Sequence, residues 1–185
     1  MRINEFIYTL KDGRRVTISS PKDEDIPSMI EMLYLASQES DFLLTYPEEC
    51  SKNTPEKEKA IFDRINNSEL EVMLLARLNN RVVGCTHLAF GERIKTRHRC
   101  FVTITISKEC WGQGLGSCLF QKLIEIAKQK EYVTQMELSF VEGNKRAQGL
   151  YEKYGFKITA KKPNAIRLKD GTMLCMYEMV KDLTI

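Results

Sequence analysis

The sequence predicts an α/β fold in which a mixed sheet is flanked by helices. Its strand-like and helical segments follow in the order β-β-α-α-β-β-β-α-β-α-β-β, which interleaves the two element types along the chain. The 185 residues are 43% apolar and 29% charged, the composition of an ordinary globular protein with a sizeable core. No repeat, low-complexity segment or linker interrupts the pattern, so we expect a single domain spanning residues 1–185.

The N-terminal half predicts a hairpin followed by two amphipathic helices. Strands at about 5–10 and 14–19 flank Lys11-Asp12-Gly13, a hairpin turn signal. Apolar residues at helical spacing mark a first helix, namely Ile26, Met29, Ile30 and Leu33. Thr54-Pro55-Glu56 combines an N-cap, a proline at the first helical position and an early acid, and predicts a second helix that continues through Ile61 and Ile65.

The rest of the chain predicts the remaining strands and two further helices. Glu71–Leu78 and Arg81–Phe90 pair across Asn79-Asn80, and a third strand runs from about 98 to 106. Two helices follow, with the strand Met136–Phe140 between them. The chain then continues through a short strand and a closing hairpin, which comprise Phe156–Thr159, Ala165–Leu168 and Met173–Val180, with Lys169-Asp170-Gly171 as the hairpin turn.

A glycine-rich turn joins the third strand of this half to the next helix. Phe101–Ile106 is strand-like, Trp111-Gly112-Gln113-Gly114-Leu115-Gly116 follows, and the helix begins near Leu115. Glycines let an anion approach the backbone N–H groups at a helix N-terminus. A P-loop would need a lysine after Gly116, and a dinucleotide fingerprint would need a glycine at Leu119, although Glu137 lies where its ribose-binding acid is expected.

A second segment identifies the anion-binding turn. Trp111–Gly116 resembles the x-x-Gly-x-Gly turn of the GNAT superfamily of acyl-CoA N-acyltransferases. Asn144–Phe156 matches every position of that family's Asn-x-x-Ala-x-x-Leu-Tyr-x-x-x-Gly-Phe pattern, with Asn144 as a helix N-cap and Gly155 as its C-cap. The chain is therefore identified as a member of this superfamily, with the fold of a mixed, mostly antiparallel sheet. Its closing hairpin resembles the closing hairpin of the bacterial members akin to ribosomal-protein and spermidine acetyltransferases.

The resemblance implies a site for acetyl-CoA as cosubstrate, with no metal. The backbone of Ile104, Thr105 and Ile106 is expected to pair with the pantetheine arm. Asn144 is expected to cap its helix or also to contact the cofactor, Tyr151 to protonate the departing thiolate as general acid, and Tyr154 to serve packing. The pyrophosphate is expected to bind the N–H groups of Gly112, Gln113, Gly114, Leu115, Gly116 and Ser117.

The general base and the acceptor stay open. Many relatives carry a glutamate on the strand before the turn, and that position falls at Phe101 here. Candidate bases are Glu92, His87 and His98, or a water chain or backbone carbonyl. The resemblance implies a small-molecule or peptide amine as acceptor (a protein N-terminus, a polyamine, an amino acid or an antibiotic), bound near 41–46 and the closing hairpin.

The net charge and the cysteine content limit the classes of partner and the cellular compartment that we expect for this protein. A net charge of +3 is too mild for a nucleic-acid binder, and no segment resembles a signal peptide or a membrane span, so we expect a cytoplasmic protein without membrane or nucleic-acid partners. Six cysteines lack metal spacing, and Cys85, Cys100 and Cys175 are expected in strands as reduced core residues.

Three matters remain open in the sequence. The basic run Arg93–Arg99 is expected to be a solvated arm, with an acidic substrate, a partner or the CoA phosphates as alternatives. A homodimer is compatible with the sequence. A non-catalytic CoA-binding sensor and a dinucleotide-binding module are the alternative functions.

Overall fold

The computed structural model describes residues 1–184, and its element order is the predicted one. Eight strands form one sheet in the order β1-β2-β3-β4-β5-β6-β8-β7. The pairs β1–β2, β2–β3, β3–β4, β6–β8 and β7–β8 are antiparallel, and β5–β6 is parallel. The chain divides into two compact units, the first comprising Met1–Ala89 and Thr103–Gln121, and the second Phe90–Val102 and the chain from Lys122 onward.

Two tight hairpins form the sheet of the first unit. β1 (Phe6–Thr9) and β2 (Arg15–Ser19) join through a turn in which the Leu10 N–H donates to the Arg14 carbonyl at 2.8 Å. β3 (Glu71–Leu78) and β4 (Arg81–Phe90) join through Asn79 and Asn80, whose φ angles of 50° and 62° fit a two-residue hairpin turn. Both predicted hairpins are confirmed.

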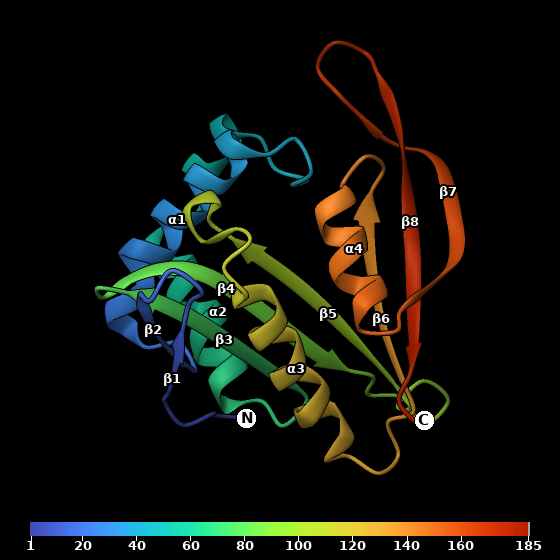
Figure 1. Ribbon diagram of the computed structural model, residues 1–185, viewed down its shortest axis with the longest axis horizontal. Coiled ribbons are helices and arrows are strands. Elements are labelled where there is room, and N and C mark those ends of the chain that lie inside the picture. Colours follow the sequence, from blue (N-terminus) through green and yellow to red (C-terminus); the bar gives the residue numbers. More distant parts are fainter. Residues whose placement is uncertain (185) are drawn as a thin grey trace. The chain divides into compact units, whose positions relative to one another are not determined.

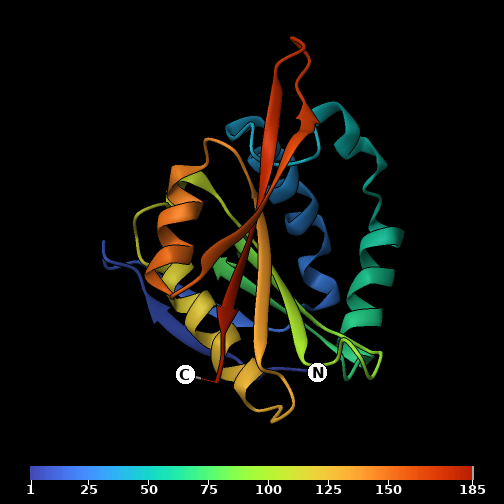
Figure 2. The ribbon, with the colours of Figure 1, turned by 90° about the vertical axis from the view of Figure 1, so that its right-hand side faces the viewer.

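Helices α1 (Ile26–Glu39) and α2 (Pro55–Asn67) lie side by side (Figures 1 and 2). The Thr54 side chain accepts a hydrogen bond from the Lys57 N–H, which confirms the predicted N-cap. Helix α2 continues through Ile61 and Ile65 as predicted, with Phe62 and Ile65 buried and Ile61 38% exposed. Apolar side chains of both helices pack against β3 and β4 in one core cluster. Its members are Ile26, Met29, Met32 and Ala36 of α1, Phe62 and Ile65 of α2, Met73 and Leu75 of β3, and Val82 and Cys85 of β4.

A buried ion pair ties the segment before α1 to the sheet of the first unit. The 3-10 helix Asp23–Asp25 ends at a carboxylate that Arg77 of β3 contacts, with Nε 2.5 Å from Asp25 Oδ1. The same guanidinium donates to Ser19 Oγ at 3.0 Å and to the Ser20 carbonyl at 3.2 Å. The N–H groups of the Arg77 guanidinium thus find acceptors, and its buried positive charge is paired with the Asp25 carboxylate.

The second unit contains the long closing hairpin. β6 (Gln135–Val141) and α4 (Lys145–Lys153) precede β7 (Lys157–Arg167) and β8 (Met173–Asp182), which form the red arm of Figures 1 and 2. The sequence indicated Phe156–Thr159 as strand-like and Ala165–Leu168 as the first arm of the closing hairpin. They form one strand, β7, whose pairing with β8 shifts register between Ile158 and Ala160 and between Lys162 and Ile166.

Most of the basic run is a turn and not a strand face. Residues 93–98 form turns before β5 (Arg99–Ile106), with the Thr96 and Arg97 N–H groups donating to the Arg93 carbonyl at 2.8 Å. The Arg97 guanidinium lies 5.5 Å from the centre of the Tyr132 ring, and Arg99 pairs with Glu137.

Helix α3 (Leu115–Lys128) buries an apolar stripe that consists of Leu115, Leu119, Leu123 and Ala127. All six cysteines are free thiols. Cys85 and Cys100 lie buried in strands as expected, but Cys175 is only half-buried, so it is not a core residue. Among residues 1–184, no helix is long and apolar enough to cross a membrane.

Candidate active site

The predicted anion-binding turn is present at the N-terminus of α3. After β5, a 3-10 helix (Lys108–Cys110) leads into Gly112 and Gly114, whose φ angles are 74° and 88°. These left-handed conformations favour glycine and account for the motif's spacing. The first N–H groups of any helix have no acceptor within the helix, and they add to the partial positive charge of its N-terminus. The turn therefore has the geometry of an anion site.

Hydrogen bonds hold this turn from several sides. The Ser107 N–H donates to the Val83 carbonyl at 3.0 Å, which anchors the end of β5 to β4. The Trp111 indole N–H donates to the Ile106 carbonyl at 2.7 Å. The Lys11 N–H, in the β1–β2 turn, donates to the Gln113 carbonyl at 3.2 Å. A turn held in this way is preorganised for a ligand.

The two glycines of the turn have different surroundings. A Cβ at Gly112 would meet nothing within 4 Å, whereas a Cβ at Gly114 would lie 2.5 Å from the Tyr8 hydroxyl oxygen. The Cα of Gly112 thus faces open space, and Gly114 is required by the close approach of Tyr8. The residues fit the pyrophosphate that the sequence predicted.

The backbone expected to pair with pantetheine lies beyond the β5–β6 ladder. That ladder pairs Arg99–Phe101 with Gln135–Glu137. Ile104, Thr105 and Ile106 follow it along β5, and the Ile106 carbonyl accepts from Trp111. Ile104 and Thr105 keep the extended backbone that an added strand would require.

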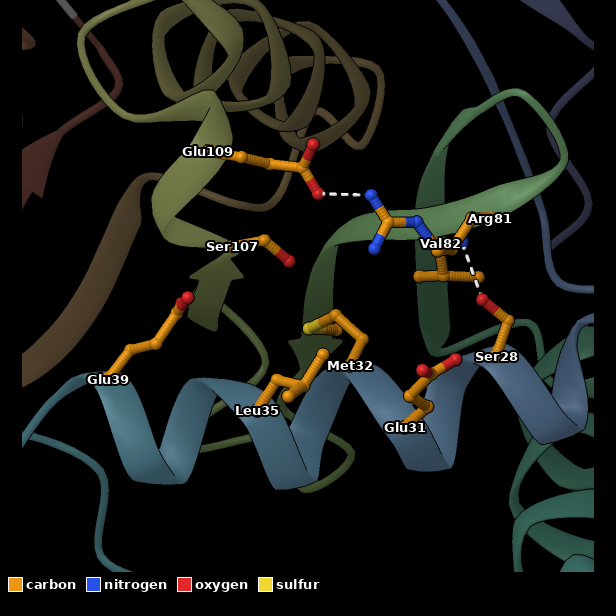
Figure 3. A pocket seen from close by; sticks show the side chains of 9 residues that line it. All are labelled: Ser28, Glu31, Met32, Leu35, Glu39, Arg81, Val82, Ser107 and Glu109. Carbon is orange, nitrogen blue, oxygen red and sulfur yellow. Dashed lines mark hydrogen bonds and ion pairs between the residues drawn. The ribbon is translucent and has the colours of Figure 1, made fainter.

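A charged network borders the approach to the turn. The Glu109 carboxylate accepts from Arg81 at 2.6 Å and lies 3.4 Å from Arg14, which also donates to the Glu109 carbonyl at 2.9 Å. The Glu39 carboxylate of α1 accepts from the Lys108 N–H at 2.9 Å. Between α1, β4 and this segment is a cavity of about 100 Å³ (Figure 3), lined by Ser28, Glu31, Met32, Leu35, Glu39, Arg81, Val82, Ser107 and Glu109.

The second unit holds Asn144 and Tyr151. Asn144 Oδ1 accepts from the Ala147 N–H at 3.1 Å, so the predicted N-cap is confirmed. Tyr151 is 7% exposed, and its ring centre lies 6.1 Å from that of Phe140 and 6.2 Å from that of Phe156. Burial raises the pKa of the Tyr151 hydroxyl to about 12. Tyr154, which we expected to serve packing, is half-buried.

The candidate bases differ in accessibility. Glu92 and His98 are exposed. His87 is half-buried, with Nε2 2.8 Å from the Glu71 carboxylate. Although burial opposes it, hydrogen bonds from Arg64 and His87 lower the pKa of Glu71, so that carboxylate stays charged beside the ring. Phe101, at the usual glutamate position, is 45% exposed.

Sequence reasoning missed a buried carboxyl on α2. Glu58 is 5% exposed, its carboxyl makes no hydrogen bond or ion pair with residues 1–184, and its oxygens keep some contact with solvent. Burial raises its pKa above the ordinary value. A sequence signal exists, because Glu58 shares helical spacing with Phe62 and Ile65 and is a charged residue on an apolar stripe.

Comparisons with known proteins agree with this geometry. The sequence profile described as "Acetyltransferase (GNAT) family" matches residues 35–156, more than half of the chain. A GNAT-family acetyltransferase from Streptococcus pneumoniae is 26% identical, with a TM-score of 0.83, covering 90% of this chain and 99% of its own. The comparison with curated proteins gives no match.

Two more distant structures share the fold. A ribosomal-protein-alanine N-acetyltransferase from Brucella melitensis is 21% identical, with a TM-score of 0.74, covering 89% of this chain and 98% of its own. A phosphinothricin acetyltransferase from Sinorhizobium meliloti, solved in complex with acetyl-CoA, is 18% identical, with a TM-score of 0.75, covering 90% and 88%. With the glycine turn, the profile match and the shared fold together, the chain belongs to the GNAT acetyltransferase family.

Proposed function

We propose that this protein is an acetyl-CoA-dependent N-acetyltransferase that acetylates a primary amine, as a single domain over residues 1–185. The observation that carries the proposal is the strand–glycine turn–helix of β5 and α3, in which Gly112 has a positive φ and faces open space. The Sinorhizobium meliloti structure, which holds acetyl-CoA in the same fold, supports this cosubstrate. Six free thiols fit a reducing, cytoplasmic compartment.

Each predicted site residue has a role in this proposal. The N–H groups of residues 112–117 bind the pyrophosphate, and the backbone of Ile104, Thr105 and Ile106 pairs with the pantetheine arm. Asn144 holds the start of α4, the helix that carries Tyr151. Tyr151 donates a proton to sulfur as the thiolate leaves. The closing hairpin favours an acceptor like those of the ribosomal-protein and spermidine branch.

Calorimetric titration with acetyl-CoA, CoA and NAD tests the cosubstrate. Gly112→Glu places a carboxylate at the open position of the turn, and should abolish acetyl-CoA binding through charge repulsion. Gly171→Glu is the matched control, because Gly171 also has a positive φ (89°) and open surroundings but lies in the β7–β8 turn. Gly114→Glu is less suitable, since its Cβ would collide with Tyr8.

The outcomes separate the candidate functions. Micromolar acetyl-CoA binding that Gly112→Glu loses and Gly171→Glu keeps would support the proposal, and CoA release with an amine panel would then establish turnover. Binding with no turnover for any amine would favour the CoA-binding sensor. A folded protein that binds no CoA would contradict the proposal, and NAD binding in its place would favour the dinucleotide module.

A further inference from the structure

Glu58 is a buried carboxyl for which the chain itself supplies no partner. It lies in the first turns of α2, where its N–H donates to the Thr54 carbonyl at 3.0 Å, and its side chain is 5% exposed. A buried carboxylate without a counter-ion is strongly unfavourable, so such groups are rare unless a ligand pairs with them. The structure pairs the other well-buried charges of this unit, as Arg77 and Asp25 show.

The surroundings of Glu58 connect it to the predicted cofactor strand. Cys85 packs in one core cluster with Phe62 and Ile65 of α2, and Glu58 lies one helical turn before Phe62 on the same buried face of that helix. Thr86 Oγ1 donates to the Thr103 carbonyl at 2.7 Å, and the Ser107 N–H donates to the Val83 carbonyl at 3.0 Å. Between these two bonds, Cys85 lies alongside 104–106, the segment expected to pair with pantetheine.

Glu58 and helix α3 lie against opposite faces of β4. A Cβ on Gly84 would meet Leu115 of α3 at 3.4 Å and Ile106 at 3.6 Å, so residue 84 faces α3. Successive strand residues point to opposite faces, and Cys85 accordingly packs in the core cluster with α1 and α2. Glu58 thus approaches β4 on the face opposite α3, and an amine that came to a thioester along β5 from this face would meet its carboxyl.

We propose that Glu58 forms the ammonium-binding part of the acceptor site and accepts the proton that the amine loses, an inference that rests on the proposed function above. The acceptor is accordingly a primary amine that arrives as a cation. This assignment adds a base to the candidates that the sequence offered, which were Glu92, His87, His98, a water chain or a backbone carbonyl.

The proposed acetyl transfer accounts for every proton and every bond. One proton of the ammonium passes to the Glu58 carboxylate, and the freed amine attacks the thioester carbon. The C–N bond forms and the C–S bond breaks, with its electron pair remaining on sulfur. The thiolate takes a proton from the general acid, and the second proton lost by nitrogen restores that acid. Glu58 then releases its proton to solvent.

Neighbouring ionisable groups are already engaged elsewhere. Cys85 of β4 is the titratable side chain that faces Glu58, and its thiol stays protonated, because burial first and Glu58 second raise its pKa to about 12. Charged residues on the elements around α2 have other partners, as the following contacts show: Lys57 with the Lys52 carbonyl, Lys59 with Asp23 and Asp63, Arg64 with Glu71, Arg77 with Asp25, and Glu39 with the Lys108 N–H.

The test compares wild type, Glu58→Gln and Glu56→Gln with a panel of n-butylamine, spermidine, an alanine-leading peptide and kanamycin. Glu56 is the matched control, because it is an exposed carboxylate two residues away on the same helix. Calorimetry of each amine into the CoA complex should show binding weakened about tenfold or more in Glu58→Gln, as expected for loss of a charged hydrogen bond. Binding of acetyl-CoA itself should not change in either variant.

The pH profile distinguishes a base from a merely structural residue. For wild type and Glu56→Gln, kcat/KM should rise with pH as Glu58 ionises, whereas Glu58→Gln should lack that acidic limb and fall about 10²-fold or more. A Glu58→Gln variant with wild-type amine binding and a wild-type profile would overturn the inference, as would a wild type that binds no amine of the panel. Failure of acetyl-CoA to bind would instead refute the proposed function.

Stability against pH gives a readout independent of turnover. Burial raises the folded-state pKa of Glu58, so its contribution is fully present at low pH and is lost as pH rises through that pKa. Glu58→Gln should therefore raise Tm at about pH 8, by about 2–4 °C, and not at about pH 4. Equal Tm differences at both pH values would contradict an unpaired carboxylate at this position.

Discussion

At the scale of single residues, Tyr151 combines a core position with the proposed acid role. Its ring packs between Phe140 and Phe156, and burial raises its pKa to about 12. The hydroxyl therefore keeps its proton throughout the physiological pH range and is ready to donate. The same burial makes the phenoxide unfavourable, so the phenol is expected to recover its proton as soon as the thiolate has been neutralised.

Removing this hydroxyl gives a test at the residue scale. Tyr151→Phe keeps the ring in the core and deletes only the proton donor, so kcat should fall about 10²–10⁴-fold while the Kd for acetyl-CoA stays unchanged. Steady-state kinetics and calorimetry measure the two quantities. Tyr154→Phe, at a half-buried tyrosine of the same helix end, should behave like wild type. Full activity in Tyr151→Phe would contradict the assignment.

At the scale of elements, the segment before α3 depends on contacts from three other elements. Arg14, next to the β1–β2 turn, and Arg81 of β4 meet at the Glu109 carboxylate, and Glu39 of α1 accepts from the Lys108 N–H. All of these side chains are partly exposed, so each ion pair contributes little to the free energy of unfolding. Their combined effect is to fix where the turn begins.

We expect Glu109→Gln to weaken acetyl-CoA binding by up to about fivefold, because an exposed pair is worth at most about 1 kcal/mol. The value of kcat should not change, and high salt should reduce the difference from wild type because it screens the pair. Glu125→Gln removes another exposed pair, with Lys122, and serves as the control. A fall in kcat with unchanged Kd would show that Glu109 acts elsewhere than on the turn.

Local sequence signals predicted where several elements begin and end. They did not predict which side chains the elements bury. Asn79-Asn80, Thr54 and Asn144 act through their own backbone neighbours, so the sequence predicted those turns and caps. Whether Ile61 or Phe62 faces the core depends on the rotation of α2 against the sheet, which helical spacing alone leaves ambiguous. The single strand β7 also escaped prediction, because register shifts let Pro163 stand within a strand.

The candidate site shows the same division. The glycine turn was predictable because Gly112 and Gly114 need left-handed conformations that few other residues adopt. Glu58 was not identified because a carboxyl on an amphipathic helix is usually solvated, and only tertiary packing shows that this one is buried without a partner.

At the scale of the whole molecule, fold and acceptor are separate matters. Structures with TM-scores of 0.74 and 0.75 include a ribosomal-protein-alanine N-acetyltransferase and a phosphinothricin acetyltransferase. The same architecture thus serves a protein amine and a small molecule, and the acceptor has to be argued from side chains such as Glu58.

The thiols give a prediction for the whole molecule. In native protein, no more than two cysteines, the half-buried Cys118 and Cys175, should react rapidly with Ellman's reagent, and all six should react in guanidinium chloride. Burial raises the pKa of Cys85 and of Cys100 to about 12, which keeps both as unreactive thiols. Rapid reaction of four or more, or a Tm that depends on reductant, would contradict the structure.

Trp111 gives the molecule an optical reporter at its proposed site. It is the only tryptophan of the chain, and its indole N–H donates to the Ile106 carbonyl beside the glycine turn. Selectively excited tryptophan fluorescence therefore originates from this one location, and its emission responds to the polarity and hydrogen bonding there. Cosubstrate arrival can be followed on the unlabelled protein in a stopped-flow instrument, so rate constants for binding become accessible before any acceptor is known.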